Sequence, residues 1–105
     1  MDRRSTFREV YKVVMRVPRG KVTTYAAIAR RLGLHPRVVA MALRENPLPL
    51  LIPCHRVIRS DGTLGGYSFG GPKVKRALLE LEGVKVDERG RVPREYIIDD
   101  LSELL

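Results

Sequence analysis

The sequence predicts a mainly α-helical fold: a small helical domain with a helix-turn-helix of the winged-helix type and a short β-hairpin. Apolar residues recur at the spacing of one helical face in four segments, and capping residues, prolines or glycines bound each segment. The stretches suited to strands are short. At 105 residues, the chain is expected to form a single domain, residues 1–105, with one modest core.

The first helix is expected to open at a capping box, in which Thr6 is followed three residues later by Glu9. It should run to about Arg16, because the Val-Pro-Arg-Gly sequence of residues 17–20 favours a turn. Residues 21–23 then favour a short extended segment.

Two short helices joined by a tight turn are expected next. Thr24 can cap the first, residues 25–32, and Gly33 suits its C-terminal stop. The second, residues 36–45, begins with a proline, whose missing N–H leaves no bond unmade in the first turn. Such a pair in the most basic part of the chain is typical of a DNA-reading helix-turn-helix, although any compact helical pair gives much the same pattern.

The second half of the chain is less regular. Pro47, Pro49 and Pro53 exclude a helix from the extended segment before Cys54. A glycine-rich loop, a helix, a hairpin and an acidic tail are expected to follow, over residues 65–71, 72–82, 84–92 and 95–105. The end of the tail suits a short amphipathic helix.

The charges are distributed unevenly along the chain. The net charge is +8; residues 1–45 hold eleven basic and three acidic side chains, whereas residues 46–105 hold nine of each. A one-sided basic field favours a polyanion such as DNA or RNA, and a solvated basic surface is the alternative interpretation.

Composition also bears on location. No apolar run is long enough to span a membrane and no signal peptide is evident, so we expect a soluble cytoplasmic protein, or a nuclear one in a eukaryote. The single cysteine excludes an internal disulfide and a cysteine zinc cluster, which favours a reducing compartment. The absence of Gln and Trp and the single Asn favour a thermophilic source.

Cys54 is the candidate nucleophile. A thiolate forms near neutral pH only beside a cation, a base or a helix N-terminus, and His55 and Arg56 follow Cys54 directly. Adjacent Cys and His side chains rarely meet, so a bridging water would be needed for proton transfer. An inert core cysteine is the alternative.

The surroundings of Cys54 carry a resemblance to a known family. Pro-Cys-His-Arg-Val at residues 53–57 follows Asn-Pro-Leu-Pro-Leu-Leu-Ile at 46–52, and Gly-Tyr-Ser comes after it at 66–68. Together these resemble the active-site signature of the O6-alkylguanine-DNA alkyltransferases, also called methylated-DNA–protein-cysteine methyltransferases. The similarity runs from about residue 7 to residue 83 and includes Val-Thr-Thr-Tyr at 22–25 and the Leu-rich helix end at 78–83.

The resemblance implies a single-use reaction. Cys54 would accept the alkyl group from guanine O6 and keep it as a thioether, so each molecule would react once. His55 would act through a water as the base that forms the thiolate, and Glu82 would orient and support its imidazole. Without the resemblance, Glu82 is an ordinary solvated residue in the last turn of a helix, where a carboxylate is mildly unfavourable.

The resemblance also implies a pocket for the base. The Tyr25 hydroxyl would donate to guanine N3 as negative charge develops on the leaving base; by periodicity alone, Tyr25 equally suits packing at a helix start. The other pocket residues would be Leu43, Val57, Tyr67 and Ser68. The Ser68 amide would meet O6, and the carbonyls of Cys54 and Val57 would accept from the exocyclic amine.

The implied partner is double-stranded DNA containing O6-alkylguanine, whose damaged base must leave the duplex before a buried cysteine can reach it. Arg37 would fill the gap in the base stack; a phosphate contact is its plainer interpretation. Arg30, Arg31 and Arg44 would attract phosphates. Asn46 would tie the recognition helix to the active-site segment, or stop that helix through an Asx-type turn.

The sequence also departs from the family. Most relatives carry an additional N-terminal domain, which is expected to be absent here, and Phe69 adds a bulky residue to the glycine-rich loop. Some relatives bind zinc in that domain, but this sequence offers no such site, so no metal and no cofactor is expected. We expect a monomer.

Two other functions stay open at this stage. One is that of the alkyltransferase-like proteins, which bind the lesion without transfer but lack a cysteine at the acceptor position. The other is a helix-turn-helix regulator that prefers a defined sequence. A cysteine hydrolase is disfavoured, because only His35 could serve as a separate partner for Cys54.

Overall fold

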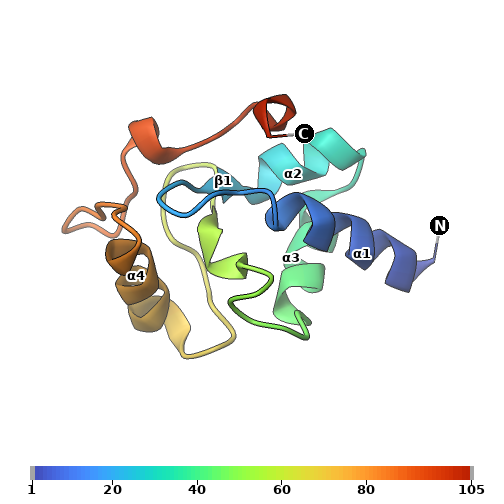
Figure 1. Cartoon of the computed structure of the whole chain (residues 1–105), viewed down its shortest axis with the longest axis horizontal. Helices are drawn as coiled ribbons and strands as arrows, with labels where there is room; N and C mark the ends of the chain where they lie inside the picture. Colours follow the sequence, from blue (N-terminus) through green and yellow to red (C-terminus); the bar gives the residue numbers. More distant parts are fainter. Residues whose placement is uncertain (1, 105) are drawn as a thin grey trace.

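The computed structural model describes residues 2–104, and four α-helices form most of its regular structure (Figure 1). The helices are α1 (Arg3–Val14), α2 (Tyr25–Leu32), α3 (Pro36–Arg44) and α4 (Gly71–Leu81). Two short strands, β1 (Thr23–Thr24) and β2 (Val57–Ile58), and three single-turn 3-10 helices, η1 (Cys54–Arg56), η2 (Arg94–Tyr96) and η3 (Leu101–Glu103), complete it. The predicted mainly helical fold class is confirmed.

Helix α1 begins earlier than its sequence predicts. Asp2 is the N-cap, and its carboxylate accepts the N–H of Ser5 at 2.8 Å. The Thr6 hydroxyl instead donates to the Asp2 carbonyl at 2.9 Å, inside the helix. The capping box at Thr6 was therefore wrong, because the ionised carboxylate of Asp2, four residues before Thr6, offers the exposed N–H groups a stronger acceptor.

Helices α2 and α3 have the predicted ends to within one residue. The Thr24 hydroxyl accepts the N–H of Ala27 at 3.0 Å, and Gly33 ends α2 in the left-handed conformation with φ of 69°. Pro36 opens α3, whose N-cap is the imidazole of His35, accepting from the N–H of Arg37 at 3.0 Å. Both helices pack with α1 into a three-helix group on one side of the molecule, opposite α4 (Figure 1).

The strands form a parallel pair between distant parts of the chain. Thr23 lies opposite Val57 and Thr24 opposite Ile58. The hairpin predicted over residues 84–92 does not form strands: the Asp87 carboxylate accepts the N–H groups of Arg89 and Arg91, each at 2.9 Å, and closes a turn. That side chain takes the donors that a hairpin ladder would use.

The C-terminal segment is an integral part of the fold rather than a loose acidic tail. The N–H of Val22 donates to the Tyr96 carbonyl at 2.9 Å, and the N–H of Ile98 returns a bond to Val22 at 2.7 Å. The segment therefore extends the edge of β1. Its predicted amphipathic helix is only the single turn η3, in which Leu101 is 2% exposed.

Two buried clusters lie on either side of the small sheet. Side chains of α1, α2 and α3 form the first, which includes Cys54 and Val57; α4 and the loops around it form the second, which includes Ile58. Adjacent strand residues point to opposite faces, so Val57 and Ile58 each serve a different core. The sheet thus places the Cys54 turn at the boundary between the two clusters.

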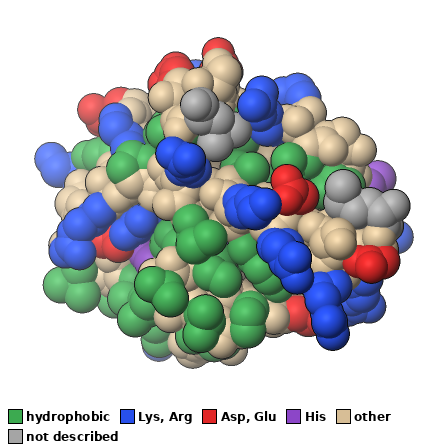
Figure 2. Space-filling view, turned by 45° about the vertical axis from the view of Figure 1, so that its right-hand side comes forward, with side chains coloured by type: hydrophobic (Ala, Val, Ile, Leu, Met, Phe, Trp, Pro, Cys, Tyr) green, Lys and Arg blue, Asp and Glu red, His purple; other side chains and the backbone are tan. Residues whose placement is uncertain are grey.

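Some apolar side chains remain at the surface. Leu48, Leu50 and Leu51, in the segment that leads to Cys54, are 50%, 58% and 69% exposed. Figure 2 shows apolar side chains gathered over the lower half of one face, with Lys and Arg beside them. Within residues 2–104, no helix combines the length and hydrophobicity needed to cross a membrane.

Replacing Leu101 tests whether the C-terminal segment belongs to the fold. Leu101→Ala should lower the free energy of unfolding by about 3 kcal/mol, because it leaves a cavity in the first cluster. Leu81→Ala, at a position 75% exposed, should change it by less than about 0.5 kcal/mol. Urea unfolding measures both; equal midpoints for the two variants would contradict the assignment.

Candidate active site

A pocket of about 610 Å³ opens beside Cys54. The start of α2, one side of α3, the Cys54 turn and the glycine-rich loop form its walls. The lining residues that bear on chemistry are Tyr25, Arg37, Arg44, Cys54, Arg59 and Tyr67. No carboxylate lines it, so the described pocket presents positive charge and aromatic surface to a ligand.

Asn46 fixes the segment that leads to the cysteine. Its side-chain amide donates to the Ile52 carbonyl at 2.8 Å, and its carbonyl oxygen accepts the N–H of Leu48 at 2.9 Å. The N–H of Cys54 also donates to the Ile52 carbonyl, at 2.7 Å. Asn46, 5% exposed, therefore holds the end of α3 to the backbone just before the nucleophile.

Cys54 is itself 5% exposed; it belongs to the first buried cluster and also lines the pocket. Burial raises the pKa of the Cys54 thiol, while the contact with Asn46 and the positive charge of Lys75 oppose that rise. The resting group is consequently a thiol that needs a base to become the nucleophilic thiolate.

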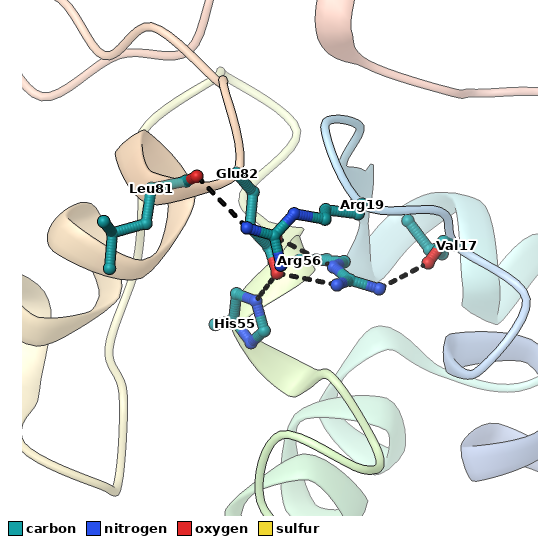
Figure 3. A network of polar contacts seen from close by, with 6 residues as sticks. All are labelled: Val17, Arg19, His55, Arg56, Leu81 and Glu82. Atoms are coloured by element: carbon teal, nitrogen blue, oxygen red, sulfur yellow. Dashed lines mark hydrogen bonds and ion pairs between the residues drawn. The ribbon is translucent and has the colours of Figure 1, made fainter.

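The imidazole of His55, the residue after Cys54, lies beside the Glu82 carboxylate (Figure 3). His55 is 2% exposed, and its Nε2 lies 3.1 Å from Oε2 of Glu82, although the N–H is not aimed well enough for a linear hydrogen bond. Among residues 2–104, no group hydrogen-bonds to Nδ1. The carboxylate thus favours the proton on Nε2 and leaves Nδ1 as a proton acceptor.

Glu82 is shared with Arg56, a residue whose role the sequence did not reveal. Nε and Nη2 of Arg56 donate to the two carboxylate oxygens of Glu82 at 2.9 and 2.6 Å, and Nη1 donates to the Val17 carbonyl at 2.9 Å (Figure 3). The Glu82 side chain is 9% exposed, so this is a largely buried, bidentate ion pair. It joins the end of α4 to the Cys54 turn and to the loop after α1.

Burial and neighbours set the charges of this group. Burial lowers the pKa of His55, and although Glu82 acts to raise it, the net shift is downward, so the imidazole is neutral and able to accept a proton near neutral pH. Burial acts to raise the pKa of Glu82, but the hydrogen bonds from Arg56 and the nearby imidazole of His55 outweigh it and keep the carboxylate ionised.

Lys75 is a second group that the sequence did not reveal. Its ammonium is fully buried and donates to the carbonyls of Val57 at 2.7 Å and Gly66 at 3.2 Å. It also lies 5.8 Å from the centre of the Tyr25 ring. Burial lowers the pKa of Lys75 to about 8. The apolar spacing of α4 predicts an inward face that includes Val74 and Leu81, but these are 38% and 75% exposed, and Lys75 and Leu79 are the buried residues of the helix. A lysine is not expected in a core.

The predicted pocket residues are distributed as follows. Leu43, Tyr67 and Ser68 line the pocket with Tyr25, and Tyr67 packs edge-on against Phe69 with ring centres 5.6 Å apart. Val57 is fully buried, and its carbonyl already accepts a bond from Lys75.

The predicted DNA-binding arginines fall into two groups. Arg37 and Arg44 of α3 line the pocket, and Arg59, which the sequence did not single out, joins them at its rim. Arg30 and Arg31 of α2 instead lie in a separate hollow beside Asp99, Asp100 and Leu101 of the C-terminal segment. Among the described residues, no group of three or more His, Cys, Asp or Glu side chains could hold a metal ion.

Removing Arg56 should destabilise the fold strongly. Arg56→Met leaves the Glu82 charge buried without its partner, which we expect to lower the free energy of unfolding by about 3 kcal/mol. Lys12→Met, which breaks the exposed pair with Glu9, should cost less than about 1 kcal/mol. Chemical denaturation compares the two; similar small losses would show that the buried pair is not structural.

The His55 and Glu82 shifts make stability depend on pH. Below the ordinary His pKa of 6.5, the unfolded chain binds a proton that buried His55 does not, so stability should fall as pH drops through 6.5. Protonation of Glu82 should reduce it further below 4.5. His55→Gln should flatten the loss just below pH 6.5, measured by urea unfolding; an unchanged slope would contradict the neutral imidazole.

Comparison with known proteins places this site in context. Residues 5–84 match the family model described as 6-O-methylguanine DNA methyltransferase, DNA binding domain. A methylated-DNA–protein-cysteine methyltransferase of Saccharolobus islandicus (strain M.16.27) is 63% identical over 79 residues, which are 75% of this chain and 51% of that protein. The chain thus spans about half the length of such relatives.

Two solved structures are similar. O6-methylguanine-DNA methyltransferase from Pyrococcus kodakaraensis strain KOD1 matches with a TM-score of 0.70 and 44% identity, over 75% of this chain and 46% of that one. S. pombe Atl1, in complex with damaged DNA containing O6-carboxymethylguanine, matches with a TM-score of 0.77 and 32% identity, over 93% and 98%. The chain belongs to the O6-methylguanine DNA methyltransferase family, whose DNA-binding domain it contains.

Proposed function

We propose that this chain repairs DNA by moving the alkyl group of O6-alkylguanine irreversibly onto Cys54. The observation that carries this proposal is a buried cysteine that lines a pocket together with arginines and is followed by a neutral His55, which lies beside an ionised Glu82. The relatives' names support it, since they describe transfer from methylated DNA to a protein cysteine.

The geometry suits nucleophilic substitution at carbon. His55, through a water, would take the thiol proton on Nδ1, and Glu82 would stabilise the charged imidazole. The thiolate would attack the alkyl carbon, the C–O6 bond would break, and the guanine would leave as an anion as a thioether forms. Tyr25, at the pocket wall, would donate its hydroxyl to that anion. With no step to remove the alkyl group, each molecule would act once.

The guanine must leave the DNA helix before transfer, because Cys54, a residue only 5% exposed, cannot reach a stacked base. We propose that α3 enters the minor groove, that Arg37 fills the gap left in the stack and that Arg44 and Arg59 bind phosphates near the pocket mouth. Arg30 and Arg31 would add long-range attraction rather than contacts at the pocket.

A second candidate is lesion binding without transfer. The similarity to Atl1, a protein crystallised with damaged DNA, spans nearly the whole of both chains. Cys54 at the acceptor position distinguishes this chain from the alkyltransferase-like proteins, so transfer is the function that its chemistry favours.

Intact mass separates these functions. After incubation with a duplex containing O6-methylguanine, the protein should gain the mass of one methylene on Cys54, once per chain; Cys54→Ala should still bind but gain nothing. Binding without a mass gain would establish the second candidate. Preference for one defined sequence over the lesion, measured by competition with unmodified duplexes, would indicate a helix-turn-helix regulator instead.

A further inference from the structure

Among residues 2–104, Lys75 is the one fully buried charged side chain near the site for which the proposed mechanism has no use. It is fully buried on α4, and its two hydrogen bonds go to neutral backbone carbonyls, those of Val57 and Gly66. No ion pair to a carboxylate is formed by Lys75 within the described chain. A buried ammonium without a counter-ion is destabilising, so its presence calls for an explanation.

Its position supplies one. The carbonyls that it binds belong to β2, just after the Cys54 turn, and to the glycine-rich loop that lines the pocket, while the ring of Tyr25 lies 5.8 Å away on a third wall. Its positive charge acts on the thiol of Cys54, whose pKa it lowers. Lys75 is therefore a fixed, buried cation between the strand that follows the Cys54 turn, the glycine-rich loop and the start of α2.

We propose that Lys75 is a positioning residue and that the thiolate of Cys54 is its counter-ion. The ammonium stabilises this thiolate and holds the Cys54 turn and the glycine-rich loop in place. During transfer, the negative charge passes from the sulfur to the departing guanine while Lys75 keeps its proton. The same cation therefore stabilises the negative charge on the nucleophile and on the leaving group. The role in transfer rests on the proposed function; the stabilisation of the thiolate does not.

Other groups also face Cys54 and would shape its titration. They come from all the elements packed around it and are Tyr11, Tyr25, Arg37, Arg44, His55, Arg59, Tyr67 and Lys75. Among them, Lys75 is the buried ammonium, and the arginines at the pocket are exposed to water that screens their charge.

The test uses no DNA. Iodoacetamide alkylates the thiolate, forming an S–C bond and releasing iodide, and the chain has a single cysteine, so the pH dependence of the mass gain reports Cys54 alone. Lys75→Met should move the rate profile to higher pH and slow alkylation near neutral pH by about tenfold, corresponding to a shift of about one pK unit. Lys75→Arg, which keeps the charge, should restore most of the rate.

Controls separate charge from packing. Lys73→Met removes an exposed lysine from the same helix and should leave the profile unchanged. Lys75→Gln keeps donors for the carbonyls, so it serves where the Met variant fails to fold, as judged by circular dichroism. A folded Met or Gln variant with the wild-type profile would overturn the proposal, as would an Arg variant as slow as Met. A shifted profile without methyl transfer from DNA would refute the proposed function alone.

Discussion

The carboxylate of Glu82 is the interaction on which the rest of the site depends. It accepts two hydrogen bonds from Arg56 and lies 3.1 Å from His55, so one buried charge joins the end of α4 to the turn that carries the nucleophile. Arg56 continues the link to Val17, and Arg19 donates to the Leu81 carbonyl at 3.3 Å (Figure 3). The two buried clusters are therefore tied by polar bonds beside the place where the chemistry needs fixed geometry.

That arrangement compensates for the opposing effects that burial has on a nucleophile. Burial excludes water and raises the pKa of the Cys54 thiol, which favours specificity but opposes formation of the thiolate. A neutral imidazole supported by Glu82 can remove the proton, and a fixed cation at Lys75 can stabilise what remains. Neither group is sufficient alone. Without Lys75, removal of the proton by His55 would leave the Cys54 thiolate in largely apolar surroundings. Without His55, the proton would stay on the thiol.

Sequence reasoning succeeded where the determinants are local. The ends of α2 and α3 follow from Thr24, Gly33 and Pro36, whose effects act within one helical turn. It failed where tertiary contacts decide. Asp2 displaced the predicted cap of α1, Asp87 closed a turn in place of a hairpin, and β1 found a parallel partner more than thirty residues away.

The site itself divides in the same way. Cys54, His55 and Tyr25 were identifiable from a motif, whereas Arg56 was passed over although it lies within that motif. Its partner Glu82 lies 26 positions along the chain, and nothing local distinguishes Arg56 from a surface arginine. Lys75 was missed because the apolar residues of α4, such as Val74 and Leu81, predict a different inward face, and because lysine is rare in a core. A lysine that a helix buries while it leaves apolar neighbours exposed points to a nearby site, because the burial of its charge has an energetic cost.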